Sequence, residues 1–368
     1  MDRTLNLTLL RDVLIRNGLN QAALAAKLNI SREAVSNWFK GEAFPTPDKL
    51  LRLGMIVGLK YNDLVKTTPP KDVPIVTYRR KAGRKTKDAH LDNARETGEL
   101  LKKLVKHLPV QELTQPPILK SPCNKYAYIQ KVAAGLRREM DLESKTVIDF
   151  KDLIDKFNKL HAVIVPVLWG ARERHGNALN IYLPDSKILW VFLNLDSNAI
   201  DFKFWMAHEL GHALAPNMNG KEGEDFADAF AQALLFPEPD AANLRTVLQG
   251  LPGIGARIEQ IRNEARRHII SPYTIRLALE AYEKANNLPA TQLGAVTSFM
   301  GSVKNFSKDY ESVAAAIFGK SAPKPDEYIA VAGDVFKSTF FKALSHFCKE
   351  EQGVDNFIIQ VLGLPLAD

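Results

Sequence analysis

Apolar and polar positions in the first forty residues repeat with the period of a helix. The run from Leu9 to Leu14 predicts a first amphipathic helix, which ends at the pair Asn17-Gly18. A second short helix is predicted over 21–28, and a third begins after Ser31, whose hydroxyl is a good N-cap. Because the apolar faces of these helices can share one core, the pattern indicates a small helical domain.

The third of these helices leaves polar side chains on its outer face. In a helix-turn-helix domain such a helix lies in the major groove of DNA, and the start of the preceding helix meets a phosphate. The candidate DNA contacts are therefore Gln21, Ser31, Arg32, Glu33, Ser36, Asn37 and Lys40. The alternative is a helical bundle that binds only other proteins.

Three apolar runs in the middle of the chain have the length of strands. Turn-forming residues such as Gly170 and Gly176 bound them. The runs cover residues 161–169, 178–183 and 188–195. They predict a small three-stranded sheet.

Helical spacing returns over residues 201–215, where two histidines are four positions apart. Because successive residues of a helix rotate by about 100°, His208 and His212 project from one face, about 40° apart. Both imidazoles can then reach one tetrahedral ion, and Glu209 can contact water at that ion without being a ligand. Background composition would give an H-E-x-x-H string only about once in a hundred chains of this length.

An acidic helix, GEDFADAFAQALLFP, follows this motif and offers the rest of a metal site. Glu224, twelve residues after His212, is the candidate third ligand. Asp228 lies one turn further along and can accept the other N–H of a ligating imidazole. Since no further Cys or His stands at a suitable spacing, the pattern predicts one Zn²⁺ per chain in a catalytic site, with Glu209 as the general base.

Composition and charge narrow the class of protein further. Charged residues interrupt the first twelve positions, as they would not in a signal peptide, and the apolar stretches are too short to cross a bilayer. Cys123 and Cys348 form no disulfide or metal pattern. We therefore expect a cytoplasmic protein without a membrane partner. The formal net charge is +7, and the basic run at 79–87 either neutralises DNA phosphates or is a solvated tether.

Two family resemblances follow from these motifs. The segment NQAALAAKLNISREAVSNWFKGEAFPTPDKLLRLGMIVGL resembles a Cro/repressor-type (Xre) helix-turn-helix over about residues 5–66. This resemblance implies five helices, a double-stranded DNA operator and a homodimer. The pair AHELGHAL and EDFADAFAQALLFP resembles the ImmA/IrrE family of zinc metallopeptidases, a gluzincin arrangement in which the glutamate before the FAxxLLxP run is the third ligand. Together the resemblances cover about residues 5–285.

The expected fold class is α+β and mostly helical, with four segments along the chain. We expect a helix-turn-helix domain over 1–66 and a basic, proline-containing linker over 67–122. A gluzincin-like domain with the three-stranded sheet and the zinc helices follows over 123–285. A helical subdomain of unassigned role is expected over 286–368.

The two motif sets together predict a DNA-binding transcriptional regulator with a zinc-dependent endopeptidase domain. By resemblance, its protein substrate is a repressor, in stress or mobile-element regulation. Because a repressor-like domain is covalently attached here, the chain's own linker is a second candidate substrate. On this interpretation the strand VFLNLD is an edge along which an extended substrate pairs, while His175 and Tyr182 are weak candidates for stabilising the oxyanion. The alternative is a non-catalytic repressor or antitoxin-like regulator that uses the zincin domain as a sensor or a partner-binding module.

Overall fold

The computed structural model of the chain contains two compact units, Met1–Val73 and Pro74–Asp368. It describes residues 2–68, 73–78, 88–109, 118–142, 147–170, 178–218, 220–319, 322–351 and 354–362. The basic run at 79–87 and His175 lie outside these described residues. Among the described helices, none is long and apolar enough to cross a membrane.

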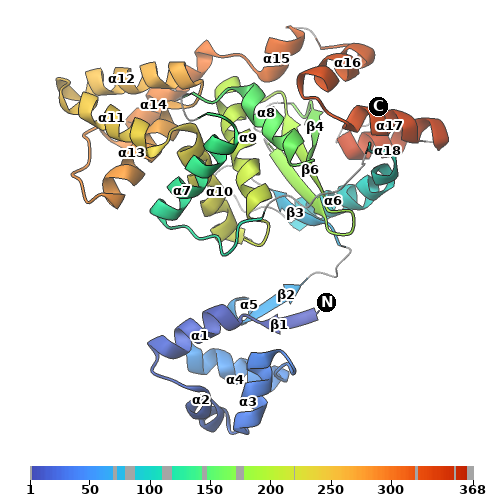
Figure 1. Ribbon diagram of the computed structural model, residues 1–368, viewed down its shortest axis with the longest axis vertical. Coiled ribbons are helices and arrows are strands. Elements are labelled where there is room, and N and C mark those ends of the chain that lie inside the picture. Colours follow the sequence, from blue (N-terminus) through green and yellow to red (C-terminus); the bar gives the residue numbers. More distant parts are fainter. Residues whose placement is uncertain are drawn as a thin grey trace. The chain divides into compact units, whose positions relative to one another are not determined.

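The described part of the first unit is a five-helix domain with a small ribbon of two strands (Figure 1). The helices are α1 (Leu7–Arg16), α2 (Gln21–Leu28), α3 (Arg32–Lys40), α4 (Pro47–Val57) and α5 (Tyr61–Leu64). The strands β1 (Asp2–Leu5) and β2 (Val65–Thr68) pair in antiparallel fashion, so the two ends of the domain meet. The five expected helices are confirmed, whereas the ribbon was not expected.

Local sequence explains where α2 and α3 begin and end. The Asn20 side chain accepts the N–H of Ala23 at 2.8 Å and so caps α2. Asn29 then takes a left-handed conformation, with φ of 53°, and turns the chain into α3. The hydroxyl of Ser31 accepts the N–H of Ala34 at 3.1 Å, as its position before α3 predicts. Gly41, with φ of 78°, ends this helix.

The second unit is built on a sheet in which the described residues form four strands. These are β3 (Ile75–Tyr78), β4 (Val163–Val167), β5 (Ala178–Leu183) and β6 (Ile188–Asn194), in the spatial order β3-β5-β6-β4. The β3-β5 and β5-β6 pairs are antiparallel, and β4 runs parallel to β6. The expectation of three strands is wrong by one, because IVTY at 75–78 is a short run after prolines, a pattern that favours a linker.

Two further expectations about this region are wrong. The strand β6, which includes the first four residues of VFLNLD, is not a sheet edge: it pairs on both sides and all seven of its residues are buried. The segment 67–122 is not simply a linker, because α6 (Asp88–Leu101) and the 3₁₀ helix η1 (Lys102–His107) belong to the fold. Leu101 and Leu104 are fully buried in the core of the second unit, since both sit on the apolar face of these helices.

Helices surround the sheet of the second unit (Figure 1). They are α7 (Tyr126–Glu139), α8 (Phe150–Lys159), α9 (Ala199–Leu214), α10 (Gly220–Leu235), α11 (Glu238–Gln249), α12 (Gly253–His268) and α13 (Pro272–Ala285). Nearly every residue of α9 is buried, because this helix lies against β5 and β6 on one side and against α10 on another. Side chains on α9 therefore face the interior of the unit.

The expected carboxyl-terminal helices are present, but they belong to the same compact unit as the sheet. They are α14 (Val296–Phe306), the 3₁₀ helix η2 (Ser307–Asp309), α15 (Val313–Phe318), α16 (Pro325–Val335), α17 (Phe340–Glu350) and α18 (Asp355–Leu362). The N–H of Ala314 donates to the carbonyl of Leu195 at 2.7 Å, and the ring of Phe340 meets the Trp190 ring edge to face. This part of the chain thus covers the sheet.

Candidate functional site

Helix α9 brings the two motif histidines into the interior of the second unit. The helix begins at Asn198, whose side chain accepts the N–H of Ile200 at 3.2 Å. Ten residues later His208 is fully buried, and His212, one turn further, is nearly so. Imidazoles buried at this spacing on one helix face are arranged for a shared ligand rather than for solvent.

Helix α10 places Glu224 beside both imidazoles. Nε2 of His208 and Nε2 of His212 are 3.0 Å apart. One Glu224 oxygen lies 3.6 Å from Nε2 of His208, and the other lies 3.4 Å from Nε2 of His212. Ligands bound to zinc at about 2.0–2.1 Å in tetrahedral geometry are about 3.3–3.4 Å from one another. The three predicted ligands are therefore brought together, and their donor types and separations fit Zn²⁺.

Asp228 orients the first histidine. Its carboxylate lies 3.0 Å from Nδ1 of His208, on the ring nitrogen that does not face Glu224. An N–H on Nδ1 donates to this carboxylate, which leaves the lone pair of Nε2 directed at the other ligands. Asp228 thus occupies the position that its spacing of one turn from Glu224 predicts.

Glu209 follows His208 on α9 and is also buried, with only 1 % of its surface exposed. Its backbone carbonyl accepts the side-chain amide of Asn180, a residue of β5, at 3.3 Å. This hydrogen bond joins α9 to the sheet at the position of the motif. Glu209 is thus a buried carboxylate that directly follows the candidate ligand His208 along α9.

Sequence reasoning missed Gly211, which sets the distance between α9 and α10. A Cβ atom at this position would lie 3.0 Å from the backbone Cα of Ala227 and 3.1 Å from a ring carbon of Phe230. Only a glycine lets the two helices approach this closely without displacement. The sequence does contain a signal for this role: Gly211 lies inside a helical motif, although a glycine in a helix interior lowers helix stability.

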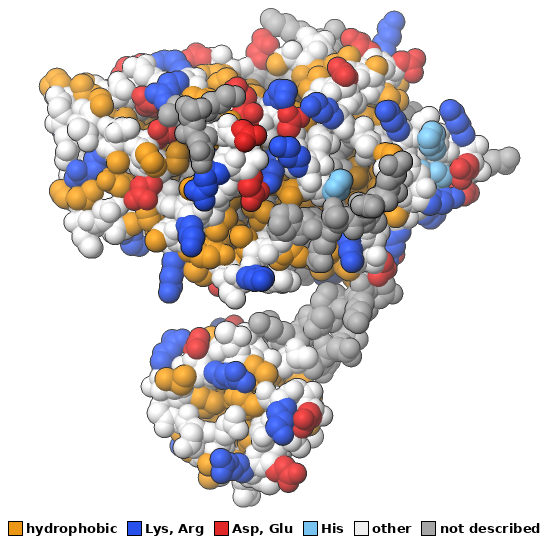
Figure 2. All heavy atoms as spheres, in the orientation of Figure 1, with side chains coloured by type: hydrophobic (Ala, Val, Ile, Leu, Met, Phe, Trp, Pro, Cys, Tyr) orange, Lys and Arg blue, Asp and Glu red, His pale blue; other side chains and the backbone are white. Residues whose placement is uncertain are grey.

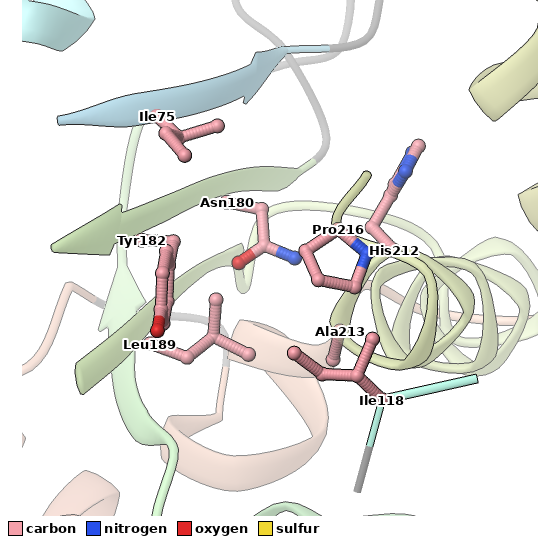
Figure 3. Close-up of a pocket in the computed structure, with 8 residues that line it drawn as sticks. All are labelled: Ile75, Ile118, Asn180, Tyr182, Leu189, His212, Ala213 and Pro216. Carbon is pink, nitrogen blue, oxygen red and sulfur yellow. The ribbon is translucent and has the colours of Figure 1, made fainter. Parts of the chain in front are cut away.

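An apolar pocket opens beside His212 (Figure 3). Ile75, Tyr182 and Leu189 form a row across three neighbouring strands on one side of it. The other residues that line it are Ile118, Asn180, His212, Ala213 and Pro216. Burial raises the pKa of the Tyr182 phenol, so its hydroxyl stays protonated at neutral pH and is a hydrogen-bond donor. Among the described residues, Tyr182 is thus the predicted oxyanion candidate that lies near the metal ligands.

The predicted DNA contacts lie on the surface of the first unit. Residues exposed to solvent are Ser31, Arg32, Glu33 and Lys40, and those half-buried at the surface are Gln21, Ser36 and Asn37. The apolar residues of α3, Val35, Trp38 and Phe39, face the core instead. Helix α3 therefore presents a polar face that is open to a ligand. Figure 2 shows Lys and Arg side chains on the surface of this unit, mixed with acidic and apolar ones.

The comparison with known proteins identifies the first unit. The chain matches a family described as helix-turn-helix over residues 10–60. These residues form a DNA-binding helix-turn-helix domain. The match covers α2 and α3 and supports a role in transcription regulation. No curated protein and no solved structure matches the chain. The likeness of residues 123–285 to ImmA/IrrE metallopeptidases stays a prediction.

Proposed function

We propose that this DNA-binding regulator carries a zinc-dependent endopeptidase in its second unit. The observation that carries the proposal is the convergence of His208, His212 and Glu224 on one point, with Asp228 behind the first histidine. Glu209 directly follows His208 and is buried. This favours a catalytic site over a structural one, because a structural zinc site does not require a buried carboxylate that is not a ligand. The motifs' resemblance to the ImmA/IrrE family supports the same assignment.

The side chains have distinct roles in peptide hydrolysis. His208, His212 and Glu224 would hold one Zn²⁺, which when bound supplies Lewis acidity to water and to a scissile carbonyl. Glu209 accepts a proton from the attacking water while the oxygen of the water bonds to the carbonyl carbon. The C–N bond then breaks, and Glu209 returns that proton to the leaving amine. The Tyr182 hydroxyl donates to the carbonyl oxygen as it gains negative charge.

The DNA partner of the first unit is a double-stranded operator, read by α3 in the major groove. A homodimer on a two-fold site fits the surface of this unit, which exposes large apolar side chains. The exposed residues are Ile15, Leu51, Met55 and Tyr61. The protein substrate is a repressor with a related helix-turn-helix or the segment of this chain within 67–122. Incubating the purified chain with Zn²⁺ tests the second option, which fails if the protein stays uncut.

The decisive experiment compares the wild type with Glu209→Gln, since this change keeps the ligand set. Glu222→Gln is the matched control because Glu222 is exposed on α10. We expect one zinc per chain by elemental analysis in all three proteins. New protein amino termini, mapped by mass spectrometry in cells, should appear with the wild type and the control and vanish with Glu209→Gln.

The same comparison separates the enzyme from a non-catalytic regulator. If Glu209→Gln leaves the cleavage pattern and the regulated transcripts unchanged while Arg32→Ala abolishes regulation, hydrolysis has no part in the function. The second unit would then act as a sensor or a partner-binding module. A gel-shift experiment with duplex DNA at several salt concentrations distinguishes DNA binding from docking of the first unit on a protein.

A further inference from the structure

We infer that the outer edge of β5 binds an extended peptide substrate, and that β3 occupies this edge as an intramolecular competitor. The inference rests on the proposed function, because it concerns how a peptide reaches the metal site. It goes beyond that function by assigning the binding surface, its occupant and a mode of regulation. Sheet edges bind extended peptides through backbone hydrogen bonds, which suits a protein substrate.

The position of β5 makes its edge the one that serves the site. Asn180 and Tyr182 of this strand line the pocket that reaches His212 (Figure 3). Asn180 also donates to the carbonyl of Glu209, so β5 is tied to the helix that carries the ligands. A peptide paired with β5 would therefore run past the metal ligands, with alternate side chains directed at the pocket.

The opposite edge of the sheet, on β4, is closed by the carboxyl-terminal helices. The hydroxyl of Ser338 donates to the carbonyl of Ile164, and the Tyr328 hydroxyl donates to the carbonyl of Pro166. These contacts use alternate carbonyls of the strand, and Pro166 has no N–H to offer. Strand addition at β4 would break both hydrogen bonds, so this edge is unsuited to a substrate.

Strand β3 currently fills the edge of β5. Its four residues pair in antiparallel register with β5, from Ile75 opposite Tyr182 to Tyr78 opposite Leu179. The side chain of Ile75 forms part of the wall of the pocket (Figure 3). Any peptide that takes the same edge must therefore displace this strand.

The described side chains of β3 are less buried than those of β4 and β6. Ile75 and Val76 are only half-buried, whereas the residues of β4 and β6 are all buried. Just before the strand, Pro74 packs so closely on Gly98 of α6 that a Cβ atom added at Gly98 would be 2.5 Å from the Cβ of Pro74. A four-residue strand whose described side chains are only half-buried can be displaced by a competitor at modest cost.

This arrangement has a kinetic consequence. Since β3 and the substrate exclude each other, the fraction of chains with a bare β5 edge multiplies the apparent affinity for substrate. Weakening β3 should lower KM while leaving kcat unchanged, on the order of ten-fold if the edge is bare in about a tenth of the chains. A purely structural role for β3 predicts the reverse: lower stability and lower kcat.

The test uses the full chain in the Glu209→Gln background, so that binding is measured without hydrolysis. The probe is a fluorescent peptide of sequence VPIVTYRR, which copies residues 73–80. The variant with weakened β3, called the displaced variant, is Ile75→Gly with Val76→Gly. The control is Ile329→Gly with Val335→Gly, which removes the same two kinds of side chain from exposed positions on α16. Zinc content and Tm are recorded for each protein to verify folding.

We expect the displaced variant to bind the peptide at least ten-fold more tightly than the wild type and the control, and a scrambled peptide to bind none of them. Equal binding to all three proteins would place the peptide elsewhere, such as the outer side of β3, and would overturn the inference. A folded displaced variant that binds no peptide would overturn it as well.

A second variant removes any dependence on the glycine substitutions. Val76→Cys with Ile181→Cys joins directly opposed residues of β3 and β5, in a background where Cys123 and Cys348 are serine. Oxidation should abolish peptide binding, and reduction by a phosphine should restore it. Equal peptide binding by the oxidised and the reduced protein contradicts the inference. With Glu209 restored, loss of all proteolysis despite redox-dependent peptide binding would refute the proposed enzyme and leave the binding edge intact.

Discussion

The carboxylate of Asp228 lies 3.0 Å from Nδ1 of His208, while Glu224 approaches the same ring from its Nε2 side. The imidazole is thus held between two acidic residues of one helix, which are one turn apart. An aspartate in this position selects the tautomer that can bind a metal and fixes the plane of the ring. Helix α10 thus contributes twice to the site: Glu224 is a candidate ligand, and Asp228 contacts the ring of another candidate ligand, His208.

Replacing Asp228 should weaken zinc binding without removing a ligand. We expect Asp228→Ala to raise the Kd for Zn²⁺ by about 10–100-fold, as loss of such a partner does in other sites. Competition with a chelating dye measures the change. Asp225→Ala is the control, because Asp225 is exposed on the same helix. Equal affinities in the two variants would show that Asp228 does not position His208.

Gly211 should be required for metal binding although it has no side chain. In Gly211→Ala the new Cβ meets the backbone of Ala227, so α10 must shift and carry Glu224 with it. Overpacking of this kind lowers the free energy of unfolding by about 1–3 kcal/mol. We expect a lower Tm and a weaker affinity for Zn²⁺.

Gly135 on α7 provides the matched control for this substitution. Its nearest neighbour to an added Cβ is the tip of the Arg138 side chain, at 3.9 Å. Gly135→Ala should therefore raise stability by up to about 1 kcal/mol, because alanine favours helices. If Gly211→Ala behaved like Gly135→Ala in a thermal melt, the close approach of α9 and α10 would not matter to the fold.

The grouping of the candidate ligands could be predicted because each pair lies on a single helix. His208 and His212 share a helix face by spacing alone, and Glu224 and Asp228 share the next helix in the same way. Contacts distant in sequence were not predictable. The sequence IVTY contains no signal that Ile75 pairs with Tyr182, more than a hundred residues away. The prolines before IVTY favour a linker instead. The burial of β6 on both sides was equally hidden, since a continuous apolar run fits either an edge or a central strand.

The acid stability of the second unit should depend on His268. Burial, together with the positive charges of Arg267 and Lys203, lowers the pKa of this imidazole to about 4. Only 2 % of its surface is exposed, and Glu264 lies 3.9 Å away. Between about pH 6.5 and pH 4 the unfolded chain binds a proton that the folded chain excludes. Stability must therefore fall as the pH drops through this window, by at most about 3 kcal/mol.

Urea unfolding at a series of pH values measures this dependence. We expect His268→Gln to flatten the loss of stability between pH 6.5 and pH 4, because the titrating group is gone. His346→Gln is the control, since His346 is exposed and should leave the pH profile of the wild type intact. A slope that persists in His268→Gln would assign the acid sensitivity to other groups.

Arg32 should contribute to sequence recognition by the helix-turn-helix domain. It is the first residue of α3 and is exposed, so its guanidinium can reach a base edge in the major groove. We expect Arg32→Ala to weaken binding to the preferred duplex, selected from random DNA, by about 1–3 kcal/mol while changing non-specific binding little. Arg52→Ala removes the same charge from an exposed position on α4 and serves as the control. Equal losses of affinity in both variants, on specific and random DNA alike, would mean that Arg32 acts only through its charge. The reason is that removing an arginine that neutralises phosphate weakens binding to every sequence uniformly.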